Sequence, residues 1–175
     1  MEDYLCDYNG ISNYRRRYLS LSFIRHRKIV TLFNKVATKQ YNGEAIRLMT
    51  ELVLTNSSHV FNTMVEKDLR ELIEGVEFIR SGKEASFKWL MDNHYLAIAA
   101  FANAVRGDKT AFRWLMKNKE VFWAATANAV NKDMKALAWL QQNKFIVYAE
   151  LAEAIVKYDQ NASDSDTTSY HRSPF

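Results

Sequence analysis

A basic segment interleaved with aromatic residues is the part of the sequence best suited to binding another molecule. From Tyr14 to Lys28 it reads YRRRYLSLSFIRHRK, and its cations are Arg15, Arg16, Arg17, Arg25, Arg27 and Lys28. Arginine and lysine pair with phosphate groups, and aromatic side chains stack on unpaired bases. The segment is therefore a candidate contact for nucleic acid, anionic lipid or an acidic protein.

An apolar face that runs through this segment and on to Phe33 favours a structural role for it. Its stripe, at heptad-like spacing, consists of Leu19, Phe23, Val30 and Phe33. A helix with such a stripe buries one side against a partner helix. Residues 11–43 contain eight Lys or Arg and no Asp or Glu, so the net charge of +4 for the whole chain leaves −4 on the remainder. We favour a solvated face, or ion pairs with the chain's own acidic helices, and keep nucleic acid, anionic lipid or an acidic protein as alternatives.

Residue types that commonly catalyse reactions or bind metals are scattered. The four histidines are His26, His59, His94 and His171, and no two of them have the spacing of metal ligands on one helix. Five acidic residues within 66–77 alternate with Lys67 and Arg70, which is typical of a solvated, salt-bridged face. The sequence therefore predicts no catalytic residue, metal site or cofactor. We expect a protein that is not an enzyme, with an enzyme of unrecognised site as a second alternative.

The cysteine content and the N-terminal residues indicate a cellular location. Cys6 is the single cysteine and cannot form an internal disulfide. Residues 1–11 contain three acidic residues and lack the apolar core of a secretory signal. The longest purely apolar run, around 95–102, is far shorter than the roughly 20 residues that cross a bilayer. A cytoplasmic protein without a membrane span is expected.

Three consecutive blocks of 25 residues resemble one another. From residue 82 they read GKEASFKWLMDNHYLAIAAFANAVR, GDKTAFRWLMKNKEVFWAATANAVN and KDMKALAWLQQNKFIVYAELAEAIV. Trp89, Trp114 and Trp139 occupy one position of the three blocks, and Asn103 and Asn128 occupy another position of the first two. Such self-similarity at a fixed period predicts a repeat architecture.

Breaks inside each block divide it into two helices. The recurrent break residues are Asn93, Asn118 and Asn143, then Gly82 and Gly107, then Asp108 and Asp133. The asparagines are expected to end the first helix in a left-handed conformation, and the glycines to separate one block from the next. The aspartates are placed to cap the following helix. Each block is therefore predicted to be a helix of about ten residues, a tight turn and a helix of about twelve.

Longer helices are expected before the repeats, at roughly 13–39, 43–55 and 60–80, with Asn56 and Gly82 as stops. The apolar side of the third includes Phe61, Met64 and Val65.

The predicted fold class is all-α, with three helical hairpins stacked as a short α-α solenoid on an N-terminal group of about three longer helices. Residues 1–158 are expected to form one domain, in which 12–81 are the N-terminal helices and 82–156 the repeats. The polar residues 159–175 are predicted to be disordered.

The run AATANAVNKDMKALAWLQQNK resembles the helix pair of ankyrin-type repeats, in which an alanine-rich helix is followed by a short turn and a helix with a leucine-rich stripe. The resemblance covers residues 85–156. The family's threonine-proline-leucine-histidine signature is absent, and a period of 25 residues leaves no room for its β-hairpin finger. The resemblance implies a stacked scaffold that binds other proteins, and it transfers no binding residue.

The recurrent tryptophans and asparagines have both a structural and a binding interpretation. Trp89, Trp114 and Trp139 would form a row, and tryptophan is enriched at binding hot spots. Each lies beside a recurrent leucine, so we favour packing within or between repeats. For Asn103 and Asn128 we favour a polar edge or a hydrogen bond between repeats.

The preferred function is a non-enzymatic scaffold that mediates protein–protein interaction, with another protein as the expected partner. The first alternative is nucleic-acid binding through the basic N-terminal helix. A homo-oligomer is also compatible with the sequence, because Phe145, Ile146 and Tyr148 make the end of the array apolar.

Overall fold

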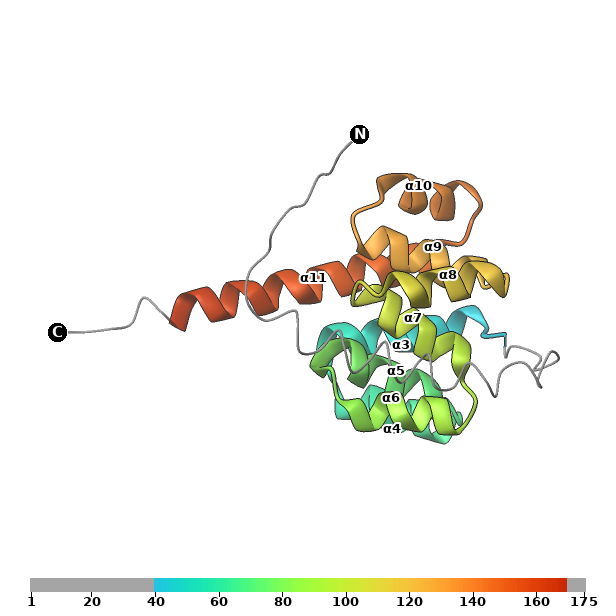
Figure 1. The fold of residues 1–175 in the computed structure, drawn as a ribbon. Helices are drawn as coiled ribbons and strands as arrows, with labels where there is room; N and C mark the ends of the chain where they lie inside the picture. Colours follow the sequence, from blue (N-terminus) through green and yellow to red (C-terminus); the bar gives the residue numbers. More distant parts are fainter. Residues whose placement is uncertain (1–39, 170–175) are drawn as a thin grey trace. The chain divides into compact units, whose positions relative to one another are not determined.

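Nine α-helices and no strand make up the described part of the chain. The computed structural model describes the backbone of residues 40–169 and the side chains of residues 40–162. In chain order the helices are α3 Gly43–Thr55, α4 Ser58–Glu66, α5 Arg70–Ser81, α6 Glu84–Asp92, α7 Leu96–Val105, α8 Lys109–Lys117, α9 Val121–Val130, α10 Met134–Gln142 and α11 Ile146–Ser169 (Figure 1). The predicted all-α class is confirmed for these residues.

The turn inside each predicted block has the same hydrogen-bonded form. After α6, the backbone N–H of Tyr95 donates to the carbonyl of Leu90 at 2.9 Å, and His94 is left-handed with φ 64°. This is a Schellman ending, in which one left-handed residue reverses the chain after a helix. The turns after α8 and α10 repeat it, with left-handed Lys119 and Lys144.

The recurrent asparagines at these turns act differently from the prediction. Their φ angles are −96°, −94° and −88°, so the left-handed residue is the next one along the chain. Each asparagine instead donates a hydrogen bond from Nδ2 to the tryptophan carbonyl four residues earlier, at 2.8, 2.7 and 2.8 Å. The predicted left-handed role was wrong, because the left-handed residue of this Schellman ending is the residue after each asparagine: His94, Lys119 and Lys144.

The breaks between blocks follow the prediction. Gly82 and Gly107 are left-handed, with φ 69° and 88°. The carboxylate of Asp108 accepts from the backbone N–H groups of Thr110 and Ala111 at the start of α8. Asp133 caps α10 in the same way. These caps set the helix starts because they satisfy N–H groups that have no partner within the helix.

A fourth hairpin precedes the three predicted ones. The expected helix 60–80 is broken into α4 and α5 at Asp68, which is left-handed with φ 53°. The N–H of Leu69 bonds to the carbonyl of Met64, so the same Schellman ending closes this turn. Thr63 occupies the position at which the later hairpins have tryptophan, so the sequence similarity between this hairpin and the three blocks is too weak to reveal the hairpin. Phe61 and Val65, which the sequence places on the apolar side of this helix, are exposed to solvent, whereas Met64 is fully buried.

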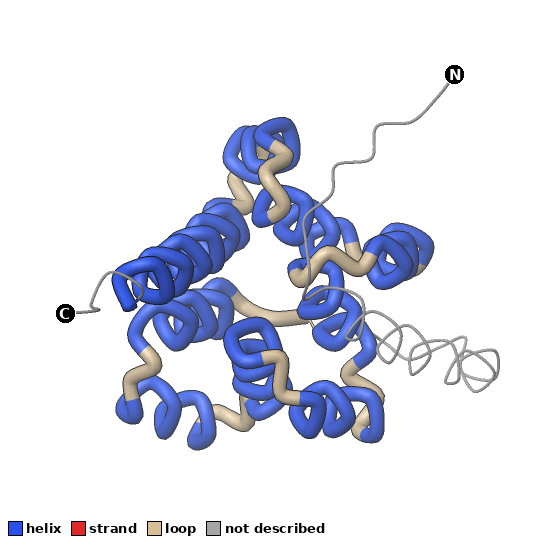
Figure 2. The backbone as a smooth tube through the Cα atoms, turned by 60° about the vertical axis from the view of Figure 1, so that its left-hand side comes forward, coloured by secondary structure: helices blue, strands red, loops and turns tan. Residues whose placement is uncertain are grey.

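The second helices of the hairpins pack against one another in sequence. Contacts join α3 to α5, α5 to α7, α7 to α9 and α9 to α11, and α11 returns to contact α3 (Figures 1 and 2). Each first helix contacts the second helices before and after it: α4 lies on α3 and α5, α6 on α5 and α7, α8 on α7 and α9, and α10 on α9 and α11. At equivalent positions of these first helices, the fully buried side chains are Met64, Leu90, Leu115 and Leu140.

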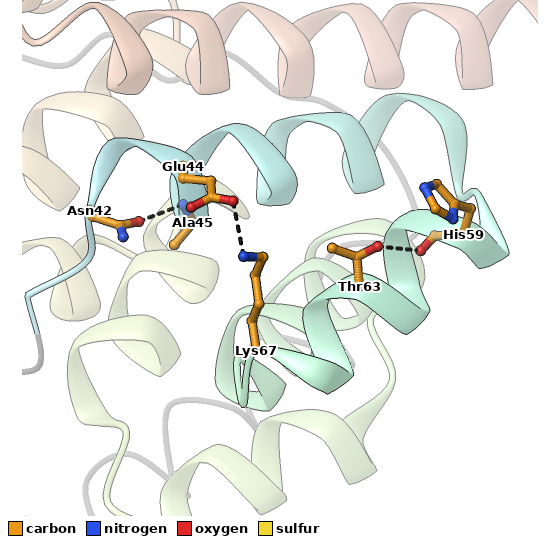
Figure 3. Close-up of polar contacts among 6 residues, drawn as sticks. All are labelled: Asn42, Glu44, Ala45, His59, Thr63 and Lys67. Carbon is orange, nitrogen blue, oxygen red and sulfur yellow. Dashed lines mark hydrogen bonds and ion pairs between the residues drawn. The ribbon is translucent and has the colours of Figure 1, made fainter.

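Polar contacts fix the beginning of α3. The Asn42 side chain accepts from the N–H of Ala45 at 2.8 Å, and Lys67 Nζ lies 3.0 Å from Glu44 Oε1 (Figure 3). The ion pair joins α3 to the end of α4. Both side chains are largely exposed, so the N-cap contributes more to the position of α3 than the ion pair does.

The last helix is longer than the sequence analysis expected. α11 continues to Ser169, into the residues 159–175 for which composition predicts disorder. The Tyr158 hydroxyl donates to the carbonyl of Arg80 at 3.4 Å, and the Arg80 guanidinium lies 4.8 Å from the centre of the Tyr158 ring. Contacts with α5 therefore hold α11 as far as this tyrosine.

Candidate interaction surface

The predicted basic site falls outside the described residues. It consists of Arg15, Arg16, Arg17, Arg25, Arg27 and Lys28, all before residue 40. Its role as a nucleic-acid contact or a solvated face stays a prediction.

The three recurrent tryptophans lie at equivalent places on α6, α8 and α10 and are partly covered. Trp89 stacks on Tyr95 with ring centres 5.6 Å apart, and the Arg70 guanidinium lies 4.5 Å above its ring. Trp139 packs on Phe145, also at 5.6 Å. Trp114 is half-buried. Both ring partners lie six residues after their tryptophan, so these contacts are made inside one hairpin.

The two recurrent asparagines differ in burial. Asn103 is buried within α7, and within the described residues its Nδ2 atom has no hydrogen-bond partner. Asn128, the equivalent residue of α9, is half-buried. Their backbone carbonyls accept from the N–H groups of Asp108 and Asp133, which closes the turn to the next hairpin. Both backbone carbonyls therefore take part in the turns that lead to the next hairpin, and a side-chain bridge between repeats stays a prediction.

An apolar patch lies where α9 and α11 begin, beside the end of α10. We call it the aromatic surface, and it consists of Val121, Phe122, Trp139, Phe145 and Ile146. The Phe122 ring lies 4.5 Å from that of Phe145, which links the two turns. The exposed fractions are 38% for Phe122, 37% for Trp139 and 47% for Ile146. Phe122 and Trp139 each contact Phe145 and are still this exposed, and large contiguous apolar patches on a protein surface typically mark an interface.

The exposure arises from the position of these residues in their helices. Val121 and Ile146 are the first residues of α9 and α11, and Phe122 is the second. The equivalent first residue of α7, Leu96, is half-buried. The first residue of the second helix is therefore more exposed in the α8–α9 and α10–α11 hairpins than in the α6–α7 hairpin, and it exposes more apolar area there.

A buried aromatic cluster packs against the inner side of the aromatic surface. Trp123 is buried and contacts Phe101 at 4.7 Å, Tyr148 at 5.4 Å and Tyr41 at 6.0 Å, measured between ring centres. Tyr148 in turn stacks on Phe122. The rings of the aromatic surface are thus anchored on the core, which limits the entropy lost when a partner binds.

Two tyrosines of this cluster have shifted titration. Burial raises the pKa of Tyr41, and the nearby carboxylate of buried Glu71 raises it further. Burial, with the carboxylate of Glu120, also raises the pKa of Tyr148. Both hydroxyls therefore stay neutral to a higher pH than the hydroxyl of an exposed tyrosine does.

A set of polar residues that the sequence analysis did not single out ties successive hairpins together. Arg80 Nη1 donates to the carbonyl of Leu52 at the end of α3, at 3.0 Å. Arg106 donates to Ile79 at the end of α5, at 3.0 Å, and Asn131 to Ala104 at the end of α7, also at 3.0 Å. The available signal was the polar residue that ends each of the first two blocks, Arg106 and Asn131.

The described residues also bear on metal binding and membrane insertion. The described residues contain no group of three or more His, Cys, Asp or Glu side chains arranged to hold a metal ion. Between residues 40 and 169, every helix is too short or too polar to span a bilayer.

Comparison with known proteins gives no relative for this chain. No protein-family model matches it, and neither a curated protein nor a solved structure matches it. The ankyrin-type resemblance of residues 85–156 therefore stays a prediction, and the function has to be argued from the surface.

Proposed function

We propose that the protein is a non-enzymatic helical-repeat scaffold that binds another protein through the aromatic surface. The observation that carries the proposal is the contact between Phe122 and Phe145, which joins two turns into one apolar patch that solvent still reaches. Aromatic side chains held by their neighbours provide contact area at low entropic cost, as in binding hot spots.

The proposed scaffold is a stack of helical hairpins. Support comes from the helix starts, because α6, α8 and α10 begin at Glu84, Lys109 and Met134, at the 25-residue period of the sequence. Stacked hairpins present equivalent positions along one edge, and this geometry suits the binding of an extended partner surface. The ankyrin-type resemblance is compatible with the same role.

The chemistry of the surface favours binding over catalysis. Its members are aliphatic and aromatic, and the charged residues of the adjoining turns are Lys119, Glu120 and Lys144. Such groups supply contact area and charge, whereas acid–base catalysis needs a paired proton donor and acceptor. We further propose a cytoplasmic location, since a single cysteine suits a reducing compartment.

A matched pair of double variants tests the proposal. Phe122→Ser with Ile146→Ser removes apolar side chains from the aromatic surface. Phe61→Ser with Val65→Ser does the same on α4, where these residues are 43% and 53% exposed. Partners would be captured from nuclease-treated host extract by the full chain and by each variant, after thermal melts have shown that all are folded. We expect partners to be lost with the first variant and kept with the second, and equal capture by both variants would contradict the proposal.

Two alternatives are separated in the same experiment. Nucleic-acid binding through the basic N-terminal segment predicts capture that is lost after nuclease treatment, that falls steeply with salt, and that is abolished by Arg15→Glu, Arg16→Glu and Arg17→Glu. Self-association through the aromatic surface predicts a mass that depends on concentration and becomes monomeric in the Phe122→Ser and Ile146→Ser variant.

A further inference from the structure

Three exposed lysines flank the aromatic surface. Lys117 ends α8, and Lys119 follows it in the turn to α9. Lys144 lies in the turn from α10 to α11, at the position equivalent to Lys119. Lys119 precedes Val121 by two residues, with Glu120 between them, and Lys144 directly precedes Phe145, so these cations lie in the same two turns as the apolar side chains.

The conformation of the turns does not account for two of these lysines. Lys119 and Lys144 are left-handed, with φ 61° and 65°. Lysine pays a steric cost in this conformation, and Gly, Asn or Asp suits it better. The equivalent position holds Asp68 in the first hairpin and His94 in the second, so the turn forms without a lysine.

Ion pairing within the described residues does not account for the lysines either. Lys67 of the first hairpin pairs with Glu44, and Arg70 pairs with Glu74. Between residues 40 and 162, no ion pair engages the lysines that flank the aromatic surface. Segments 116–122 and 141–148 together contain three lysines and one glutamate, which gives this area a charge of +2.

We propose that the aromatic surface binds an acidic amphipathic segment of a partner protein. The inference rests on the proposed function and adds the chemistry of the partner. Apolar side chains of that segment cover Phe122, Trp139 and Ile146, and its carboxylates pair with Lys117, Lys119 and Lys144. A desolvated apolar centre with charged groups at the rim is the ordinary anatomy of a specific protein interface, and the rim charges select the partner.

The packing of the rings favours a protein segment over nucleic acid or lipid. Phe122 stacks on Tyr148 and lies at a tilt against Phe145, so other rings already cover part of its surface and leave less of it open to bases. More than half of the Phe122 and Trp139 side chains is covered, with exposed fractions of 38% and 37%. Rings held this close to the body do not reach the depth at which membrane-inserting side chains lie.

Three synthetic helical peptides test the inference on the full chain. All carry one stripe of leucine and phenylalanine, flanked by glutamates in the first, glutamines in the second and lysines in the third. Binding is measured by fluorescence anisotropy with a label on each peptide. We expect the acidic peptide to bind roughly tenfold more tightly than the neutral one, and the basic peptide to bind most weakly.

Charge reversal on the protein provides the decisive comparison. Lys119→Glu with Lys144→Glu should weaken binding of the acidic peptide roughly tenfold and make the basic peptide the preferred one. Lys83→Glu with Lys88→Glu makes the same change of charge at exposed lysines of the α6 hairpin and should leave the order of the peptides unchanged. A shift of equal size in both variants would overturn the inference, because it would show an effect of net charge alone.

Other outcomes separate the inference from the proposed function. Equal binding of the three peptides overturns the acidic partner, and the proposed function survives if Phe122→Ser with Ile146→Ser still abolishes that binding. Failure of all three peptides also overturns the inference. Tighter binding to phosphatidylserine vesicles or to single-stranded RNA than to the acidic peptide overturns the inference in favour of those ligands. A dimer of the full chain that becomes monomeric in the Lys119→Glu with Lys144→Glu variant also overturns it, in favour of self-association.

Discussion

A Cβ atom placed on Gly82 would lie 2.8 Å from Nη2 of Arg106. Gly82 is the left-handed residue that ends α5, and the Arg106 guanidinium bonds the last carbonyls of the same helix. The absence of a side chain at Gly82 therefore makes room for the group that joins one hairpin to the next.

We predict that Gly82→Ala destabilises the protein by about 2 kcal/mol, through left-handed strain together with displacement of the guanidinium. Gly107→Ala is the matched control, since Gly107 is also left-handed but has no atom within 4 Å of an added Cβ. It should cost about 1 kcal/mol, from strain alone. Urea unfolding followed by circular dichroism measures both. Equal costs would show that Arg106 adjusts freely.

Removal of the guanidinium tests the same contact from the other side. Arg106→Ala deletes the bonds to Phe78 and Ile79 and should cost about 1 kcal/mol, a value reduced by the exposure of the side chain. In that background the cost of Gly82→Ala should fall to that of Gly107→Ala. Arg113→Ala, at an exposed residue of α8, should change stability little. Additive effects of Gly82→Ala and Arg106→Ala would contradict the coupling.

Gly75 marks a close approach of two helices. A Cβ there would lie 2.7 Å from Cγ2 of Ile98, which places α5 directly against α7. Gly75→Ala gains helix propensity but overpacks a buried contact, so we expect a net loss of about 1 kcal/mol. Ile98→Leu removes the methyl group on Cβ and should recover part of this loss in the double variant. A stabilising Gly75→Ala, seen as a higher midpoint in urea, would mean that the helices separate at little cost.

The aspartate caps of α8 and α10 should each contribute about 1 kcal/mol, because each satisfies two N–H groups that the helix leaves unpaired. Thermal melts of Asp108→Ala and Asp133→Ala test this. Asp92→Ala provides the comparison, since Asp92 lies at the end of α6, where a negative charge has no favourable dipole. It should be neutral or slightly stabilising, and a loss as large as that at the caps would count against the capping role.

Stability should decline above about pH 10 because of Tyr41. Burial and Glu71 raise the pKa of Tyr41 above its ordinary value of 10.0, so the unfolded chain loses the phenolic proton at a lower pH than the folded one. The resulting stabilisation is complete below pH 10 and falls as the pH rises beyond it. Tyr148 acts in the same direction. Unfolding free energies measured on both sides of that pH should show a steeper decline in the wild type than in Tyr41→Phe, and parallel curves would contradict the shift.

The helix boundaries of residues 82–156 could be predicted from short stretches of sequence. Asp108 and Asp133 cap helices through N–H groups two and three residues away, and Gly82 and Gly107 take conformations that their own geometry allows. These interactions are local along the chain, and the residue types are enough to predict them. The hairpin of α4 and α5 escaped prediction because Asp68 breaks the chain without a glycine or a recurrent tryptophan.

The neighbours of each helix depend on contacts that the repeated sequence does not specify. Three similar blocks carry nearly the same apolar pattern, so the pattern alone does not tell which copy is covered and which is left open. Leu151 and Ile155 of α11, which packs on α3, α9 and α10, are fully buried, whereas Phe122 and Ile146 stay exposed at the turns. The composition and the helix caps determined an all-helical chain of hairpins. The packing between distant helices decided where its candidate binding surface lies, because burial is a property of the assembled helices.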